Sequence, residues 1–70
     1  MREVEVEFTR NCLMSFHDPK TGRTQWYCSD MFRGEKTVFS DVVSASPTKV
    51  TLVCLDGEHA KVPVDAIRFI

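Results

Sequence analysis

Three cysteines and two histidines are the side chains of this sequence that could bind a metal or attack a substrate. They are widely spaced, at Cys12, His17, Cys28, Cys54 and His59. Structural zinc sites usually contain cysteine pairs about two to four residues apart, and this chain has no such pair. Nucleophilic catalysis needs a histidine held beside a cysteine, and nothing in the sequence predicts that contact. We therefore expect no metal, no cofactor and no enzymatic activity, and we predict that the cysteines are small buried side chains.

Aromatic and basic residues between positions 20 and 33 form a second set of interest. Exposed aromatic and methionine side chains anchor protein interfaces, whereas buried ones would only fill one end of the core. We predict a protein-binding surface made of Trp26, Tyr27, Met31, Phe32 and Arg33. The alternative is a contact with single-stranded nucleic acid, by charge and by base stacking on the tyrosine. The basic residues for that contact would be Lys20, Arg23 and Arg33.

Length and composition limit the kind of protein that carries these residues. Seventy residues fit a single domain, 1–70, which removes only about 60% of its unfolded surface from water. The net charge of −1 lacks the basic excess of a typical free-standing nucleic-acid binder. We find no signal segment, no long apolar run and no disulfide framework, so we expect a cytoplasmic protein that does not enter membranes. Because the chain opens with Met1 and has no linker, we also expect a complete small protein.

Alternating residues and turn residues predict the elements of the first half. At 2–9, apolar residues alternate with Glu3, Glu5 and Glu7, which predicts a half-buried strand with Arg68 as a neighbour of the glutamates. Strands at 12–16 and 23–28 flank a turn and form a hairpin. Residues 29–34 are either one helical turn or an irregular loop. A strand at 37–44 follows, with a bulge or bend at Asp41.

The last third of the chain predicts a hairpin, a short turn and a final strand. Strands at 50–55 and 58–62 flank Asp56-Gly57, a two-residue turn in which both residues would take positive φ. Pro63 ends the second of these strands, residues 64–66 fit a 3-10 turn, and 67–70 form the last strand. Many short strands and no long helix predict an all-β barrel whose closure removes the sheet edges.

This order of elements resembles the end of an SH3-like small β-barrel, over residues 38–70. The resemblance implies five to seven short strands with a 3-10 turn before the last one, here with an enlarged first loop or hairpin from Asn11 to Lys36. "VTLVCLDGEHAKVPVDAIRFI" also looks like the end of Tudor domains, which bind methylated lysine or arginine in an aromatic cage. The turn Leu55-Asp56-Gly57 lacks the aromatic neighbours of that cage.

Two further subfamilies end in a similar way but lack their functional residues here. Sm-like RNA-binding proteins carry a Lys-His pair before Ala-Ile, and this chain has Val64-Asp65 at that place. Plasmid-borne dihydrofolate reductases need Val-Gln-Ile-Tyr before the proline, where this chain has His59-Ala60-Lys61-Val62. The subfamily therefore stays unassigned, and a fold of this kind hosts many functions.

We expect a non-enzymatic protein-binding module, acting alone or as a homo-oligomer, that docks on a larger protein. A small phage or mobile-element inhibitor or adaptor would have this character. The alternative is a nucleic-acid-binding small barrel, Sm-like or Tudor-like.

Overall fold

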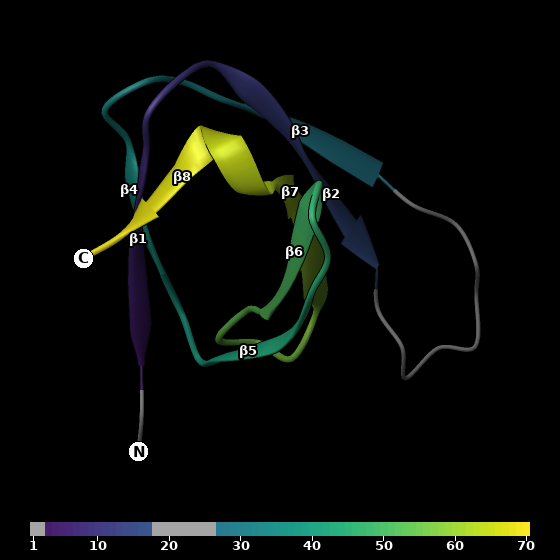
Figure 1. Ribbon diagram of the computed structural model, residues 1–70. Helices are drawn as coiled ribbons and strands as arrows, with labels where there is room; N and C mark the ends of the chain where they lie inside the picture. Colours follow the sequence, from purple (N-terminus) through teal and green to yellow (C-terminus); the bar gives the residue numbers. More distant parts are fainter. Residues whose placement is uncertain (1–2, 18–26) are drawn as a thin grey trace.

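The computed structural model describes residues 3–17 and 27–70, and this part of the chain is all-β (Figure 1). Its elements are β1 (Val4–Phe8), β2 (Cys12–His17), β3 (Tyr27–Met31), β4 (Lys36–Phe39), β5 (Asp41–Ala45), β6 (Lys49–Val53), β7 (His59–Pro63), η1 (Val64–Ala66) and β8 (Ile67–Phe69). The predicted all-β class and the predicted 3-10 turn at 64–66 are confirmed. Within the described ranges we find no helix with the length and apolar character needed to cross a membrane.

The strands form two antiparallel sheets, with the orders β4-β1-β8 and β3-β2-β7-β6-β5. The chain passes from the first sheet to the second at Ser40, whose backbone N–H donates to the Val53 carbonyl (2.8 Å). This bend divides the strand predicted at 37–44 into β4 and β5. It is one reason that the described residues form eight strands where five to seven were expected. A bulge between Val42 and Ser44 lies close to the one predicted at Asp41.

The two sheets do not join into a closed barrel. No strand of one sheet pairs with a strand of the other in the described part of the chain, so the prediction that closure removes the sheet edges is wrong. The short last strand explains part of this result. β8 has three residues after η1, and within the described ranges it pairs with β1 alone. β4 and β8 therefore remain edge strands of the smaller sheet.

The outer face of β1 carries the predicted glutamate stripe. Val6 and Phe8 are buried, whereas Glu3 and Glu5 are exposed. Glu7 lies opposite Arg68 of β8, whose guanidinium donates to the Glu7 carboxylate. This hydrogen bond and the charge of Arg68 lower the pKa of Glu7. The predicted neighbour of the glutamates is thus confirmed.

In the segment from Asn11 to Lys36, the described residues form the paired strands β2 and β3 and then a turn. β2 pairs with both β3 and β7, so it is an interior strand of the larger sheet. β3 runs on to Met31, which shows that the helical turn considered for 29–34 is wrong. The Glu35 N–H donates to the Phe32 carbonyl (3.1 Å), and Gly34 takes φ of 92°. A positive φ at the third position of such a turn is typical of type II and favours glycine.

The turn between β6 and β7 differs in detail from the predicted one. The Gly57 N–H donates to the Cys54 carbonyl (2.9 Å), and the Cys54 N–H donates to the Glu58 carbonyl (2.7 Å). Gly57 has φ of 95°, whereas no non-glycine residue in the described ranges has positive φ. Leu55 and Asp56 are therefore the central residues, and Gly57 follows in the bulge position of a longer hairpin loop. The prediction of positive φ at both Asp56 and Gly57 is wrong.

The core lies between the sheets and takes side chains from nearly every strand. Its buried members are Val6, Phe8, Met14, Met31, Phe39, Val50, Leu52, Ala60, Val62, Ala66 and Ile67. Cys12 and Cys54 are half-buried at its margin, but Cys28 is exposed. Cys28 pairs with Ser15 on the outer face of the hairpin, so the prediction that it is buried is wrong.

Candidate functional site

An open groove lies between β4 of the smaller sheet and β2 and the β6–β7 turn of the larger one. Its volume is ≈ 360 Å³. Most of its lining side chains are apolar, and it contains Met14, Phe16, Thr37, Val38, Phe39, Cys54, Leu55 and Asp56. Leu55 is 63% exposed at the turn, and Val38 is 36% exposed on β4. Apolar side chains that stay exposed around a concave surface are typical of binding sites.

A pair of stacked aromatic rings borders this groove. Phe16 and Tyr27 lie opposite each other on β2 and β3, with ring centroids 5.3 Å apart and planes inclined by 19°. The Tyr27 hydroxyl donates a hydrogen bond to the Glu58 carboxylate, which follows the β6–β7 turn. This bond is the main reason that the pKa of Tyr27 rises to about 12. The first residue of β3 is thereby linked to the turn that carries Leu55 and Asp56.

The aromatic neighbours that the sequence around Leu55-Asp56-Gly57 lacks are thus supplied by the β2–β3 hairpin. They come from residues far away in the chain, Phe16 and Tyr27, of which Phe16 lines the groove. Stacked rings present one aromatic wall, whereas a cage for a methylated cation needs several walls around it. The geometry offers an apolar groove with acidic residues at its margin.

The titratable groups near the groove are poorly suited to nucleophilic chemistry. Burial raises the pKa of the Cys54 thiol, and the charges of Asp56 and Glu58 raise it further. A thiol with a raised pKa stays protonated at neutral pH and is a weak nucleophile. In the ranges 3–17 and 27–70, no three histidine, cysteine or acidic side chains lie close enough together to hold a metal ion.

Of the predicted protein-binding residues that the structure describes, Met31 is buried and the others are exposed. Tyr27 and Phe32 are 52% and 55% exposed, but Met31 is buried at 9%. Met31 lies opposite Cys12 in the register, and this places its side chain in the core, so its assignment to the binding surface is corrected. Tyr27 begins β3 and Phe32 follows its last residue, so the two are roughly 16 Å apart at about 3.3 Å per residue. Trp26 lies outside the described residues.

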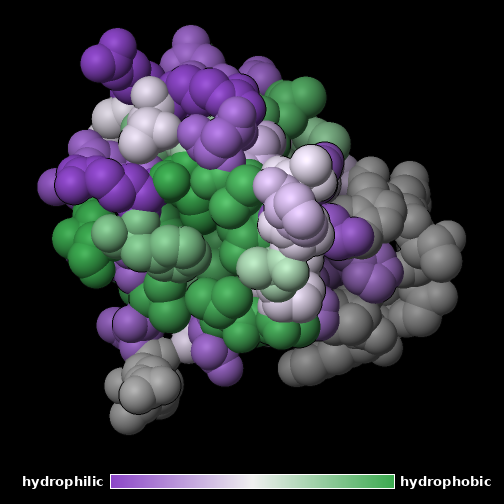
Figure 2. Space-filling view, in the orientation of Figure 1, coloured by the Kyte–Doolittle hydropathy of each residue, from purple (hydrophilic) through white to green (hydrophobic). Residues whose placement is uncertain are grey.

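A second apolar surface faces the viewer in Figure 2. Hydrophobic side chains gather over the area between β8 and the β5–β6 hairpin, with hydrophilic residues above it. Exposed apolar residues in these elements, and directly after β8, are Val42, Val43, Phe69 and Ile70.

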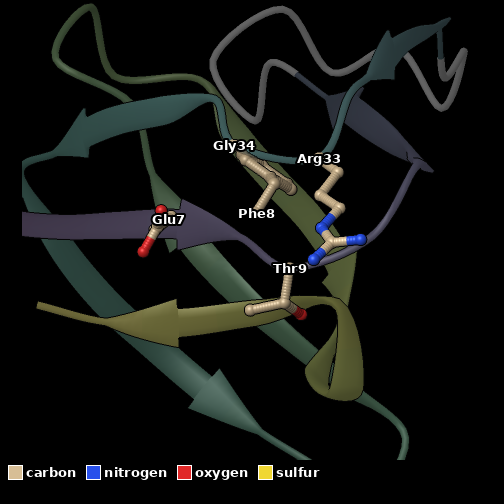
Figure 3. Close-up of a pocket in the computed structure, with 5 residues that line it drawn as sticks. All are labelled: Glu7, Phe8, Thr9, Arg33 and Gly34. Carbon is tan, nitrogen blue, oxygen red and sulfur yellow. The ribbon is translucent and has the colours of Figure 1, made fainter.

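Arg33 lies beside a smaller pocket of ≈ 200 Å³, formed with Glu7, Phe8, Thr9 and Gly34. Figure 3 shows the Arg33 side chain extending toward Thr9, while the Glu7 carboxylate points away from it. The Arg33 backbone N–H donates to Asn11 Oδ1 (2.8 Å), which fixes the start of this turn. Lys20 and Arg23, the other residues predicted to contact nucleic acid, lie outside the described part of the chain.

Sequence reasoning missed most of the groove. Phe16, Val38 and Glu58 were not singled out, and Leu55 and Asp56 were considered only as turn residues. One signal was present: the alternation of Cys12, Met14 and Phe16 places Phe16 on the core-facing side of β2. The pairing of that strand with β7, which brings Phe16 near the β6–β7 turn, has no signature in the sequence.

Comparison of the chain with protein-family models, with curated proteins and with solved structures finds no match.

Proposed function

We propose that this chain is a non-enzymatic protein-binding module that holds a segment of a larger protein in the groove. The carrying observation is the groove itself, which leaves Leu55 and Val38 exposed beside half-buried Phe16 and Cys54. Covering these side chains would remove apolar area from water, which favours association. The Phe16–Tyr27 stack adds a rigid aromatic border, and aromatic residues are common anchors of interfaces.

The order of elements supports placing this module on an SH3-like plan. A bent strand, a hairpin, a 3-10 turn and a short last strand follow one another as β4/β5, β6–β7, η1 and β8. In this proposal the β2–β3 hairpin corresponds to the enlarged first loop. The raised pKa of the Cys54 thiol argues against a nucleophilic role for that group.

The test compares capture of a partner by the wild-type chain and by two leucine variants. Leu55 lines the groove, whereas Leu13 on the outer face of β2 is similarly exposed, at 56%, and lies away from it. Immobilised wild type, Leu55→Ser and Leu13→Ser are incubated with nuclease-treated extract of the organism that encodes the chain. We expect a protein that the wild type and Leu13→Ser retain and Leu55→Ser loses.

Two results would contradict the proposed function. Equal retention by Leu55→Ser and Leu13→Ser would show that the groove is not the contact surface. Recovery that depends on intact nucleic acid, and that falls steeply as salt rises, would favour the nucleic-acid-binding barrel instead.

A further inference from the structure

The free edge of β4 presents backbone groups beside the groove. In an antiparallel sheet, successive residues of a strand direct their N–H and C=O groups to opposite neighbours. On β1, the Glu5 carbonyl accepts a hydrogen bond from the Ile70 N–H, next to β8 (3.0 Å). Val38 lies opposite Glu5 in the β1–β4 register. The N–H and C=O of Val38 therefore point away from β1, toward the unpaired edge of β4.

This edge and the groove form one continuous feature, because Val38 belongs to both. Lys36 lies opposite Glu7, two residues from Val38, and so directs its backbone groups to the same edge. Among the described residues, β4 pairs with β1 only. An unpaired strand edge beside side-chain pockets is the arrangement that binds extended peptides by strand addition.

Two carboxylates give the groove a negative margin. Asp56 Oδ1 accepts the Glu58 N–H (3.0 Å), and Glu58 Oε2 accepts the Tyr27 hydroxyl. One oxygen of each carboxylate remains available, and neither forms an ion pair in the part of the chain that the structure describes. Among the described residues, no basic side chain lines the groove. A cationic side chain would therefore meet complementary charge at this margin.

We propose that the occupant of the groove is an extended, basic segment of another protein that adds a strand to the free edge of β4. This inference rests on the proposed function and names the chemistry of the partner. The segment's backbone pairs with Val38, an apolar side chain enters the groove against Phe16 and Leu55, and a lysine or arginine reaches Asp56 and Glu58. Side chains on one face of a strand recur every second residue, so the apolar and basic residues are two positions apart.

The probe for this proposal is the peptide Ac-STVTKTVS-NH2, which places valine, lysine and valine on one face of a strand. Its controls are the same peptide with glutamate in place of lysine, and one with N-methylated backbone at the central residues. Binding is followed by amide chemical shifts and by hydrogen exchange of the Val38 amide. The protein variants are Asp56→Asn with Glu58→Gln, which keep the hydrogen-bond acceptors, and Asp30→Asn as a matched control on β3.

We expect the lysine peptide to bind and to protect the Val38 amide from exchange. The double variant should bind roughly tenfold more weakly because two exposed ion pairs are lost, and Asp30→Asn should bind as the wild type does. Equal binding of the glutamate or N-methylated peptide would overturn the proposal, as would binding without protection of Val38. Protection that grows with protein concentration in the absence of peptide would assign the edge to a second copy and also overturn it.

Failure of this inference is distinguishable from failure of the proposed function. If the lysine peptide shows no binding at millimolar concentration while Leu55→Ser still loses its captured protein, the groove remains a protein-binding site. In that case only the basic, strand-adding occupant is refuted.

Discussion

The hydrogen bond between Tyr27 and Glu58 makes a prediction that one titration can test. The chain contains one tyrosine, so the absorbance of tyrosinate near 295 nm reports on Tyr27 alone. We expect a midpoint at about pH 12, the value to which the bond with Glu58 and smaller effects of burial and of nearby charges raise the pKa. An unperturbed tyrosine titrates near pH 10.

Variants at Glu58 separate the causes of this shift. The hydrogen bond to Glu58 is the largest cause and the charge of Glu58 is a smaller one, with Asp56 contributing as well. Glu58→Ala removes both effects of the carboxylate, so its midpoint should fall most of the way to pH 10. Glu58→Gln keeps a neutral acceptor and should give an intermediate midpoint. Asp30→Asn, on the same strand as Tyr27 but outside this contact, should leave the midpoint at about 12.

The pH dependence of stability has a definite sign. The folded pKa of Tyr27 is raised above its unfolded value, so the contribution of this bond is complete below pH 10 and disappears as pH rises through about 12. Circular dichroism at each pH shows whether the titration takes place in the folded chain. A wild-type midpoint near pH 10 in the folded protein would refute the contact between the hairpin and the β6–β7 turn.

Three substitutions test the fold and the limits of the site. Gly34→Ala should lower the free energy of unfolding by about 1 kcal/mol, because φ of 92° disfavours a Cβ even where the surrounding space is open. With a urea slope of about 1 kcal/mol/M, the unfolding midpoint should fall by about 1 M. An unchanged midpoint would contradict the turn. Leu52→Ala, at a fully buried position, should lower the free energy of unfolding by about 2–5 kcal/mol, which is enough to unfold much of so small a domain. A smaller loss in thermal unfolding would place Leu52 outside the core. Phe32→Ala should change the free energy of unfolding by less than about 0.5 kcal/mol. It should also leave capture of the partner intact, since this exposed ring lies outside the groove. Loss of capture would extend the contact surface beyond the end of β3.

Local patterns in the sequence predicted the elements that depend on near neighbours. The alternation around Glu3, Glu5 and Glu7 identified β1 and its faces, because period-two burial is set by the strand itself. The turn before β7 and the 3-10 turn after Pro63 were predicted from residues that restrict the backbone locally. The two glycines with positive φ in the described ranges are Gly34 and Gly57. Both lie in segments predicted to interrupt the strands, at 29–34 and at Asp56-Gly57.

Features that depend on register or on distant segments were not predictable in this way. Whether Met31 or Phe32 is buried depends on the pairing of β3 with β2, which places Met31 opposite Cys12. The same pairing puts Cys28 beside Ser15 on the outer face. The groove requires β2, β4 and the β6–β7 turn to meet, and these segments are separated by long stretches of chain. Phe16 and Asp56 can be recognised as groove residues only when the packing of these three segments is known.

The gap between the two sheets explains why the groove and a free strand edge occur together. A closed barrel would pair every strand edge, whereas here the gap between β4 and β2 leaves both the groove and the backbone of Val38 accessible. An exposed edge also invites aggregation, and natural sheets limit this risk with short edge strands, charges and bends. β4 has these protections, since it is four residues long, begins with Lys36 and ends at the bend at Ser40. An edge protected in this way favours a short, specific partner strand over indefinite pairing.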